Sequence, residues 1–198
     1  MESSPSEQPL TLPSTPEGYI YAGPVSDFLP SKTDAINNET QNPGSETECP
    51  ATTITSPLAG GSACSFEKKG PKEGDEYLIR VIEIPQPEGR YPPQKRVAVS
   101  YYHKKWYAFI NICPHQGSAL SRGSMMDIED MGIVWGAGIT CKLHDWTFDA
   151  HSGQSDSTRF VIDTYDVKEI DGHVFVSQAP RNANVAGPRR DFGGKEMN

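Results

Sequence analysis

The chain has 198 residues, a formal net charge of −8 and a pI near 5.1. This acidic balance argues against nucleic acid or an anionic membrane surface as the main partner, because both repel negative charge. Hydrophobic residues make up only 35% of the sequence beside 18 Gly and 17 Pro, so a large part of the chain is not expected to bury enough apolar surface to become ordered.

Cysteine content and apolar runs narrow the class of protein further. Four cysteines in a chain of this length do not suggest a disulfide-dense secreted domain, and no apolar run is long enough to cross a bilayer. The first residues, MESSPSEQPLTLPSTPEG, have neither the basic start of a secretory signal nor the Arg-rich composition of a transit peptide. We therefore expect a cytoplasmic protein without a membrane span.

Composition divides the chain into three regions. Residues 1–73 are polar and lack a sustained period, so they are predicted to be a mostly disordered leader without chemistry, in which only Tyr19 to Pro30 could pack locally. Its Cys49 and Cys64 are expected to be isolated surface thiols. Residues 74–178 are predicted to be the folded domain, and residues 179–198 a tail.

Short segments rich in β-branched and aromatic residues follow one another through the predicted domain, with polar breaks between them. The predicted strands are Tyr77–Ile84, Lys95–Tyr102, Lys105–Ile112, Ile133–Thr140, Trp146–Asp149, Arg159–Ile170 and His173–Ser177. Hairpin turns are predicted at His103-Lys104 and Asp171-Gly172. No segment with a helical period is long enough to predict a helix. The pattern indicates an all-β domain built from small sheets.

Two segments of this domain carry residues that bind metals. They are Cys113-Pro114-His115-Gln116-Gly117 and Cys141-Lys142-Leu143-His144-Asp145-Trp146, and each supplies one Cys and one His. Two thiolates and two imidazoles are what a [2Fe-2S] cluster with two Cys on one iron and two His on the other requires. The same four residues could hold zinc, although zinc fingers usually pair Cys with Cys and His with His, whereas each half-site is mixed here.

The two segments resemble the Rieske iron–sulfur family. FINICPHQGSALSRGS and ITCKLHDWTFDAHSGQ are similar to the two cluster-binding loops of Rieske ferredoxins and of Rieske domains in oxygenases. The resemblance covers about residues 74–178. It implies a Rieske fold, in which an antiparallel β-sandwich or barrel-like base carries a small cluster-binding subdomain, and it implies one [2Fe-2S] cluster per chain.

The resemblance also implies a role for each residue of the motifs. Cys113 and Cys141 would bind the inner iron as thiolates, and His115 and His144 would bind the outer iron as neutral imidazoles. In the family the histidine edges face solvent and are the expected electron exit. The residues that would surround the cluster and tune its potential are Gln116, Gly117, Ser118, Asp145 and Trp146. The other histidines, His103, His151 and His173, are expected at the surface, and no residue is predicted to be catalytic.

Departures from the high-potential Rieske proteins of respiratory chains indicate the low-potential branch of the family. Those proteins join the two loops by a disulfide, at positions occupied here by Ser118 and Leu143. They also place Ser and Tyr hydroxyls where this chain has Trp146 and Phe148. Because hydroxyl donors to the cluster stabilise its more negative, reduced form, their loss predicts a low potential.

Two further differences concern the loops. Asp145 stands where the family usually has Gly, but Asp tolerates the left-handed backbone conformation better than most residues. The segment between the motifs, Ser118 to Thr140, looks longer than in compact ferredoxins. We expect it to be a solvated loop, with a partner-docking feature as the alternative.

Three functions compete. The first is a soluble electron-transfer protein that passes single electrons from a reductase to an oxygenase or another redox enzyme. The second is a Rieske subunit or component of an oxygenase or a nitrite-reductase-like oxidoreductase. An oxygenase acting alone needs a 2-His-1-carboxylate iron site, which in the family lies in a large domain after the Rieske domain, whereas only a short segment without His follows residue 178. The third is a structural zinc or regulatory module. We favour the first.

Overall fold

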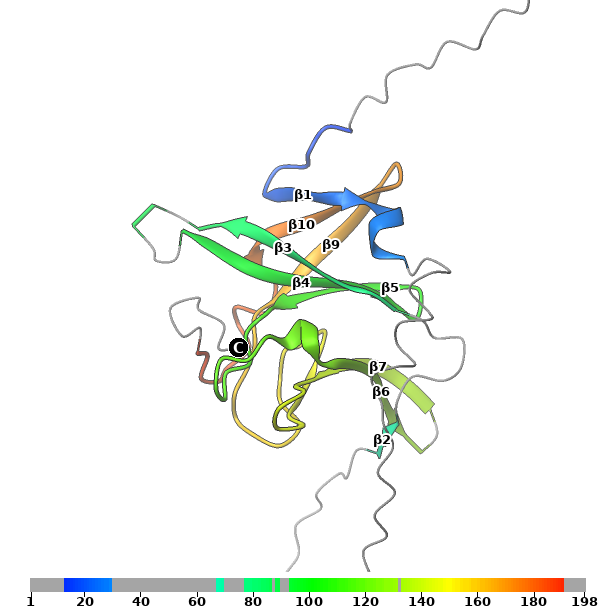
Figure 1. The fold of residues 1–198 in the computed structure, drawn as a ribbon, viewed down its shortest axis with the longest axis vertical. Coiled ribbons are helices and arrows are strands. Elements are labelled where there is room, and N and C mark those ends of the chain that lie inside the picture. The colour runs from blue at the N-terminus through cyan, green and yellow to red at the C-terminus, as the bar shows by residue number, and fades with distance from the viewer. Residues whose placement is uncertain are drawn as a thin grey trace, which may run out of the picture.

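The computed structural model describes residues 13–29, 67–69, 77–86, 88–89, 93–131 and 133–190. In these ranges the chain forms two antiparallel sheets, the larger of which lies above the smaller in Figure 1. The six-stranded sheet has the order β1 (Tyr19–Pro24), β10 (His173–Pro180), β9 (Thr164–Ile170), β5 (Lys105–Ile110), β4 (Gln94–Tyr102) and β3 (Ile79–Pro85). The four-stranded sheet has the order β2 (Glu67–Lys69), β6 (Ser124–Asp130), β7 (Ile133–Thr140) and β8 (Thr147–Asp149). The predicted all-β class is confirmed.

Both predicted hairpin turns are present. The two residues between β4 and β5, His103 and Lys104, have φ of 47° and 60°, and those between β9 and β10, Asp171 and Gly172, have φ of 50° and 74°. Positive φ at both central residues is the mark of the two-residue turn whose twist matches that of the flanking strands. Each turn joins two strands that pair with each other, β4 with β5 and β9 with β10.

The core occupies both faces of the large sheet at its centre. Four successive residues of β4, Val97 to Ser100, are fully buried, which a strand shows only when each of its faces is covered. One face is covered by the short 3-10 helix η1 (Val25–Phe28), whose Phe28 packs edge-on against Trp106 with ring centroids 5.5 Å apart. Toward the small sheet, the backbone N–H of Met125 in β6 donates a hydrogen bond to the Tyr77 hydroxyl oxygen (3.0 Å).

The N-terminal region contributes to this sheet. Strand β1 pairs with β10 from Tyr19 opposite Ser177 to Pro24 opposite His173, and Phe28 is 1% exposed. The predicted domain boundary at residue 74 therefore leaves out a strand and a core side chain. An edge strand of six residues cannot be assigned from local sequence, because its partner lies about 150 residues further along the chain. Cys49 and Cys64 lie outside the described residues.

The predicted tail also packs on the domain. Strand β10 continues to Pro180, and Asn182 beyond it is 4% exposed. The Asn182 side chain donates to the carbonyls of Ser152 (2.7 Å) and Ile162 (2.8 Å) and accepts from the N–H of Thr164 (3.1 Å). A buried amide that satisfies three backbone groups fixes the chain that carries it, so the folded unit extends beyond the predicted boundary at residue 178.

The segment between the motifs is not a solvated loop. It forms β6, which pairs along its length with β7, and Met125 is fully buried while Asp127 is 2% exposed. The Asp127 carboxylate accepts a hydrogen bond from the Tyr102 hydroxyl (2.8 Å) and pairs with His103 Nε2 (2.5 Å). The Asp127 carboxylate is thus buried with partners on β4 and its turn, which local sequence does not reveal.

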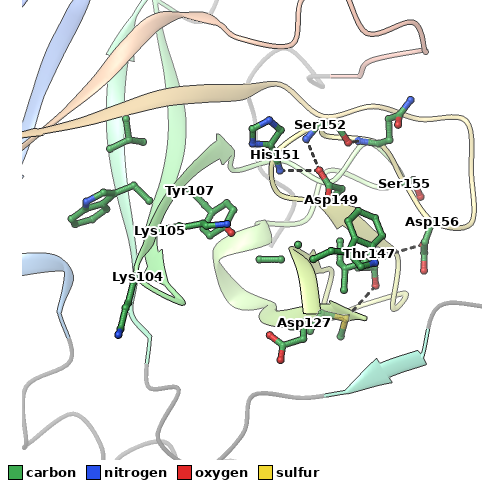
Figure 2. Close-up of a pocket in the computed structure, with 18 residues that line it drawn as sticks. Lys104, Lys105, Tyr107, Asp127, Thr147, Asp149, His151, Ser152, Ser155 and Asp156 are labelled. Atoms are coloured by element: carbon green, nitrogen blue, oxygen red, sulfur yellow. Dashed lines mark hydrogen bonds between the residues drawn. The ribbon is translucent and has the colours of Figure 1, made fainter. Parts of the chain in front are cut away.

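A cavity of about 900 Å³ lies between the two sheets. Figure 2 shows Lys105 and Tyr107 of β5 on one side of it and Thr147 and Asp149 of β8 on the other. Burial, followed by the nearby charges of Asp149 and Asp127, raises the pKa of Tyr107. None of the four predicted metal ligands lines this cavity. In the described ranges no helix is long and apolar enough to span a membrane.

Candidate metal centre

The two motifs form loops of the same design at the ends of strands. In the first, the N–H of Cys113 donates to the carbonyl of Ser118 and the N–H of Gly117 donates to the carbonyl of Cys113, both at 2.8 Å. In the second, Cys141 N–H donates to the Trp146 carbonyl (2.8 Å) and Asp145 N–H donates to the Cys141 carbonyl (3.0 Å). The backbone of each cysteine is therefore hydrogen-bonded to the backbone of the residues four and five positions after it.

This shared design explains the residue at position 145. The fifth residue of each closed loop must turn the chain with a positive φ, which is 78° for Gly117 and 53° for Asp145. Glycine adopts this conformation freely, and Asp is among the few other residues that visit it routinely. The prediction that Asp145 is compatible with the loop is confirmed.

The two loops bring their histidines together. The rings of His115 and His144 have centroids 4.0 Å apart and planes inclined by 69°. The Nδ1 atoms of both are buried and have no hydrogen-bond partner among the described residues. Buried ring nitrogens are normally hydrogen-bonded. Two buried nitrogens without such partners, on adjacent rings, fit a pair of metal ligands.

The two cysteines also meet. Cys113 and Cys141 are buried and neither is in a disulfide. A hydrogen bond between their side chains is the largest cause of their opposite shifts: it raises the pKa of Cys113, with burial acting in the same direction, and lowers the pKa of Cys141 to about 4. The two sulfurs therefore lie within hydrogen-bond reach of each other.

The loops direct hydrogen-bond donors at both sulfurs. The backbone at His115 favours the anionic form of Cys113, and the backbone at Leu143 and His144 favours that of Cys141. Thiolates that accept several such donors are the usual ligands of iron–sulfur clusters, whose potential depends on these bonds. The donor set therefore fits two anionic sulfur ligands.

The four donors are arranged as two pairs. No three His, Cys, Asp or Glu side chains in the described ranges gather as a site for one metal ion. Two thiolates and two imidazoles are the ligands that a [2Fe-2S] cluster with two Cys on one iron and two His on the other requires.

The surrounding residues differ in what they contact. Trp146 stacks on the His115 ring with centroids 4.3 Å apart and planes 12° from parallel, and on its other side lies Phe160, with centroids 5.9 Å apart. Arg190 lies over the Phe160 ring at 5.1 Å. Sequence reasoning named Trp146 but missed Phe160 and Arg190, because no motif links positions so far from the loops.

The other two predicted neighbours of the cluster differ in exposure. Ser118 is 7% exposed, and its hydroxyl oxygen lies 3.0 Å from Cys141 Sγ. Gln116 is exposed. Leu143 is 62% exposed, whereas Pro114 is buried.

The three remaining histidines have other partners. His103 pairs with Asp127, and the Tyr21 hydroxyl lies 3.2 Å from Nδ1 of His173. His151 is exposed and lies 2.7 Å from the Arg181 guanidinium through its Nδ1. These contacts account for all three without a metal.

Comparison with known proteins agrees with the loops. Residues 77–165 match the family model described as the Rieske [2Fe-2S] domain, and a search of curated proteins found no match.

Several solved structures are similar to the chain. A Sphingomonas yanoikuyae B1 ferredoxin is 23% identical, with 52% of this chain and 88% of that chain covered and a TM-score of 0.35. The ferredoxin of carbazole 1,9a-dioxygenase from Nocardioides aromaticivorans IC177 is 20% identical, with 52% and 86% covered and a TM-score of 0.37. A Mycobacterium tuberculosis protein assigned as an NADH-dependent nitrite reductase small subunit is 18% identical, with 52% and 85% covered and a TM-score of 0.41. On the family match, residues 77–165 form a Rieske [2Fe-2S] domain, and a domain of this kind implies a single [2Fe-2S] cluster.

Proposed function

We propose that the protein is a cytoplasmic electron-transfer protein that passes single electrons from a reductase to an oxygenase or another redox enzyme. The observation that carries this proposal is the difference in burial between the two donor pairs. Cys113 and Cys141 are buried, whereas His115 and His144 are half-buried at the protein surface. A redox centre with one edge at the surface can exchange electrons with a docked partner.

In this proposal Cys113 and Cys141 hold the inner iron through Sγ, and His115 and His144 hold the outer iron through their Nδ1 atoms. The cluster supplies one-electron redox chemistry when bound. The protein holds the sulfurs away from water, directs backbone N–H groups at them, and fixes the His115 ring against Trp146. These residues position the redox centre without forming a substrate site of their own.

The second loop also supplies a contact for a partner. Leu143 is 62% exposed and directly precedes His144. A large apolar side chain left exposed beside a redox ligand supports docking at this edge, since apolar contacts at the centre of an interface exclude water. The electron would then leave through the imidazole edge that the partner covers.

Reoxidation of the chemically reduced protein separates the carrier from the enzyme. We expect the reduced protein to give up one electron per chain to an added Rieske oxygenase component. The loss of the EPR signal of the reduced cluster measures this transfer. With oxygen or nitrite alone we expect no catalytic turnover. Sustained consumption of either without a protein partner would contradict the carrier and favour the oxidoreductase-component alternative.

We further propose a potential toward the bottom of the range of about −150 to +300 mV covered by Rieske centres. Trp146 and Phe148 offer no hydroxyl, and Phe148 is fully buried. A hydrogen bond to a charged acceptor contributes roughly 1.5–3 kcal/mol at most, which corresponds to many tens of millivolts for a one-electron couple. Trp146→Ser together with Phe148→Tyr should therefore raise the potential measured by protein-film voltammetry.

The control for this pair is Trp146→Ala, which removes the same ring without adding a hydroxyl. We expect the Ala variant to stay well below the double variant. A potential near the top of the Rieske range in the unaltered protein would contradict the low-potential assignment and indicate a respiratory-type acceptor.

A further inference from the structure

Ser118 connects the two cluster loops. Its carbonyl accepts the N–H of Cys113 at 2.8 Å and so closes the first loop. Its hydroxyl oxygen lies 3.0 Å from Sγ of Cys141 in the second loop. The residue is 7% exposed, so water competes little for this bond, and a hydrogen bond in such a low-dielectric setting is stronger than in solvent.

The hydroxyl is the donor in this contact. A cysteine that binds iron is a thiolate and has no proton to donate, whereas a Ser hydroxyl carries one. The Ser118 hydroxyl thus favours negative charge on the sulfur pair.

We propose that the Ser118 hydroxyl is a hydrogen-bond donor to the cluster ligand Cys141, that it raises the reduction potential, and that it ties the two loops together. The proposal rests on the proposed ligand role of Cys141. The sequence suggested that the cluster lacks hydroxyl donors, because positions 146 and 148 are Trp and Phe. In this proposal the first loop supplies a hydroxyl donor through Ser118. The respiratory branch uses this same position for a loop-joining cysteine.

The direction of the effect follows from charge. Reduction adds one electron to the centre, so a donor to a ligand sulfur stabilises the reduced form more than the oxidised form. Removing the donor should make reduction less favourable. The potential should consequently fall when Ser118 loses its hydroxyl, although every iron ligand is still present.

The first test is the potential of Ser118→Ala, measured by protein-film voltammetry on the cluster-loaded full chain. We expect a shift of about tenfold in the reduction equilibrium toward the oxidised form, which is 59 mV for a one-electron couple. Iron content and the oxidised absorption spectrum should stay as in the unaltered protein. The matched control is Ser121→Ala, three residues along the same segment. Ser121 uses its backbone N–H, which donates to Asn111 Oδ1 at 2.7 Å, and its replacement should leave the potential unchanged.

Two further measurements separate a donor from a packing residue. Pulsed EPR of the reduced protein in D₂O should show an exchangeable deuteron coupling that Ser118→Ala lacks. Ser118→Thr, which keeps a hydroxyl, should restore both the coupling and the potential. A packing role would not move the deuteron coupling.

An unchanged potential in a cluster-loaded Ser118→Ala protein would overturn the proposal. If the Ala variant holds no cluster, the same test uses Ser118→Gly, which also lacks the hydroxyl. An unchanged potential in the Gly variant would likewise overturn the proposal. Loss of the cluster from both, with retention in Ser118→Thr, would support the role in tying the loops. The potential is measured without a partner protein, so these results do not depend on the proposed electron-transfer role. If the unaltered protein held no cluster, that result would instead contradict the assignment of the four ligands.

Discussion

Ala in place of either His115 or His144 should abolish the Rieske absorption and EPR spectra and remove most of the iron. Both Nδ1 atoms are buried and have no hydrogen-bond partner among the described residues, and the rings lie 4.0 Å apart. Ala offers no donor at that position, and the adjacent imidazole cannot hold the outer iron alone. Iron analysis and EPR of the reduced protein measure the loss.

The control for the histidine variants is His151→Ala. His151 is exposed and contacts Arg181, so its removal should leave iron content and spectra unchanged. Native spectra in both the His115 and the His144 variants would show that the ligands are misassigned. Loss in the His151 variant would show that the spectra respond to any histidine change.

Phe28→Ala should lower the free energy of unfolding by about 3–5 kcal/mol, the cost of deleting a large buried aromatic side chain. Phe28 is 1% exposed and packs edge-on against Trp106 at 5.5 Å. Urea unfolding followed by tryptophan fluorescence measures the change, since Trp106 reports on the packing that is lost. A loss of this size would show that η1 contributes to the stability of the domain.

Leu29→Ala is the matched control for this position, because Leu29 is the next residue but is 39% exposed. Its replacement should cost much less, on the order of 0.5 kcal/mol for a surface site. Equal losses in the two variants would contradict the placement of Phe28 in the core. A chain that begins after residue 30 should be destabilised at least as much as Phe28→Ala, because it also loses β1.

Local sequence predicted those features that depend on neighbouring residues. The two motifs carry all four donor residues within segments of a few residues, and the turns at His103-Lys104 and Asp171-Gly172 depend only on their own backbone preferences. The same is true of Asp145, whose positive φ is a local property. The two hairpins that these turns close, β4–β5 and β9–β10, were therefore predicted.

Features that depend on distant partners could not be predicted. Strand β1 pairs with the far end of the chain, and Asp127 is buried only because Tyr102 and His103 meet it from β4 and its turn. The Ser118 hydroxyl reaches a sulfur 23 residues away. For Asp127 and Ser118 the residue type alone favours a polar loop, and only tertiary contact gives each another role.

Iron and acid-labile sulfide analysis of the purified protein tests the central claim most directly. A Rieske domain that uses Cys113, His115, Cys141 and His144 should contain two irons and two sulfides per chain and show the EPR signal of a Rieske centre when reduced. One zinc per chain and no sulfide would contradict it.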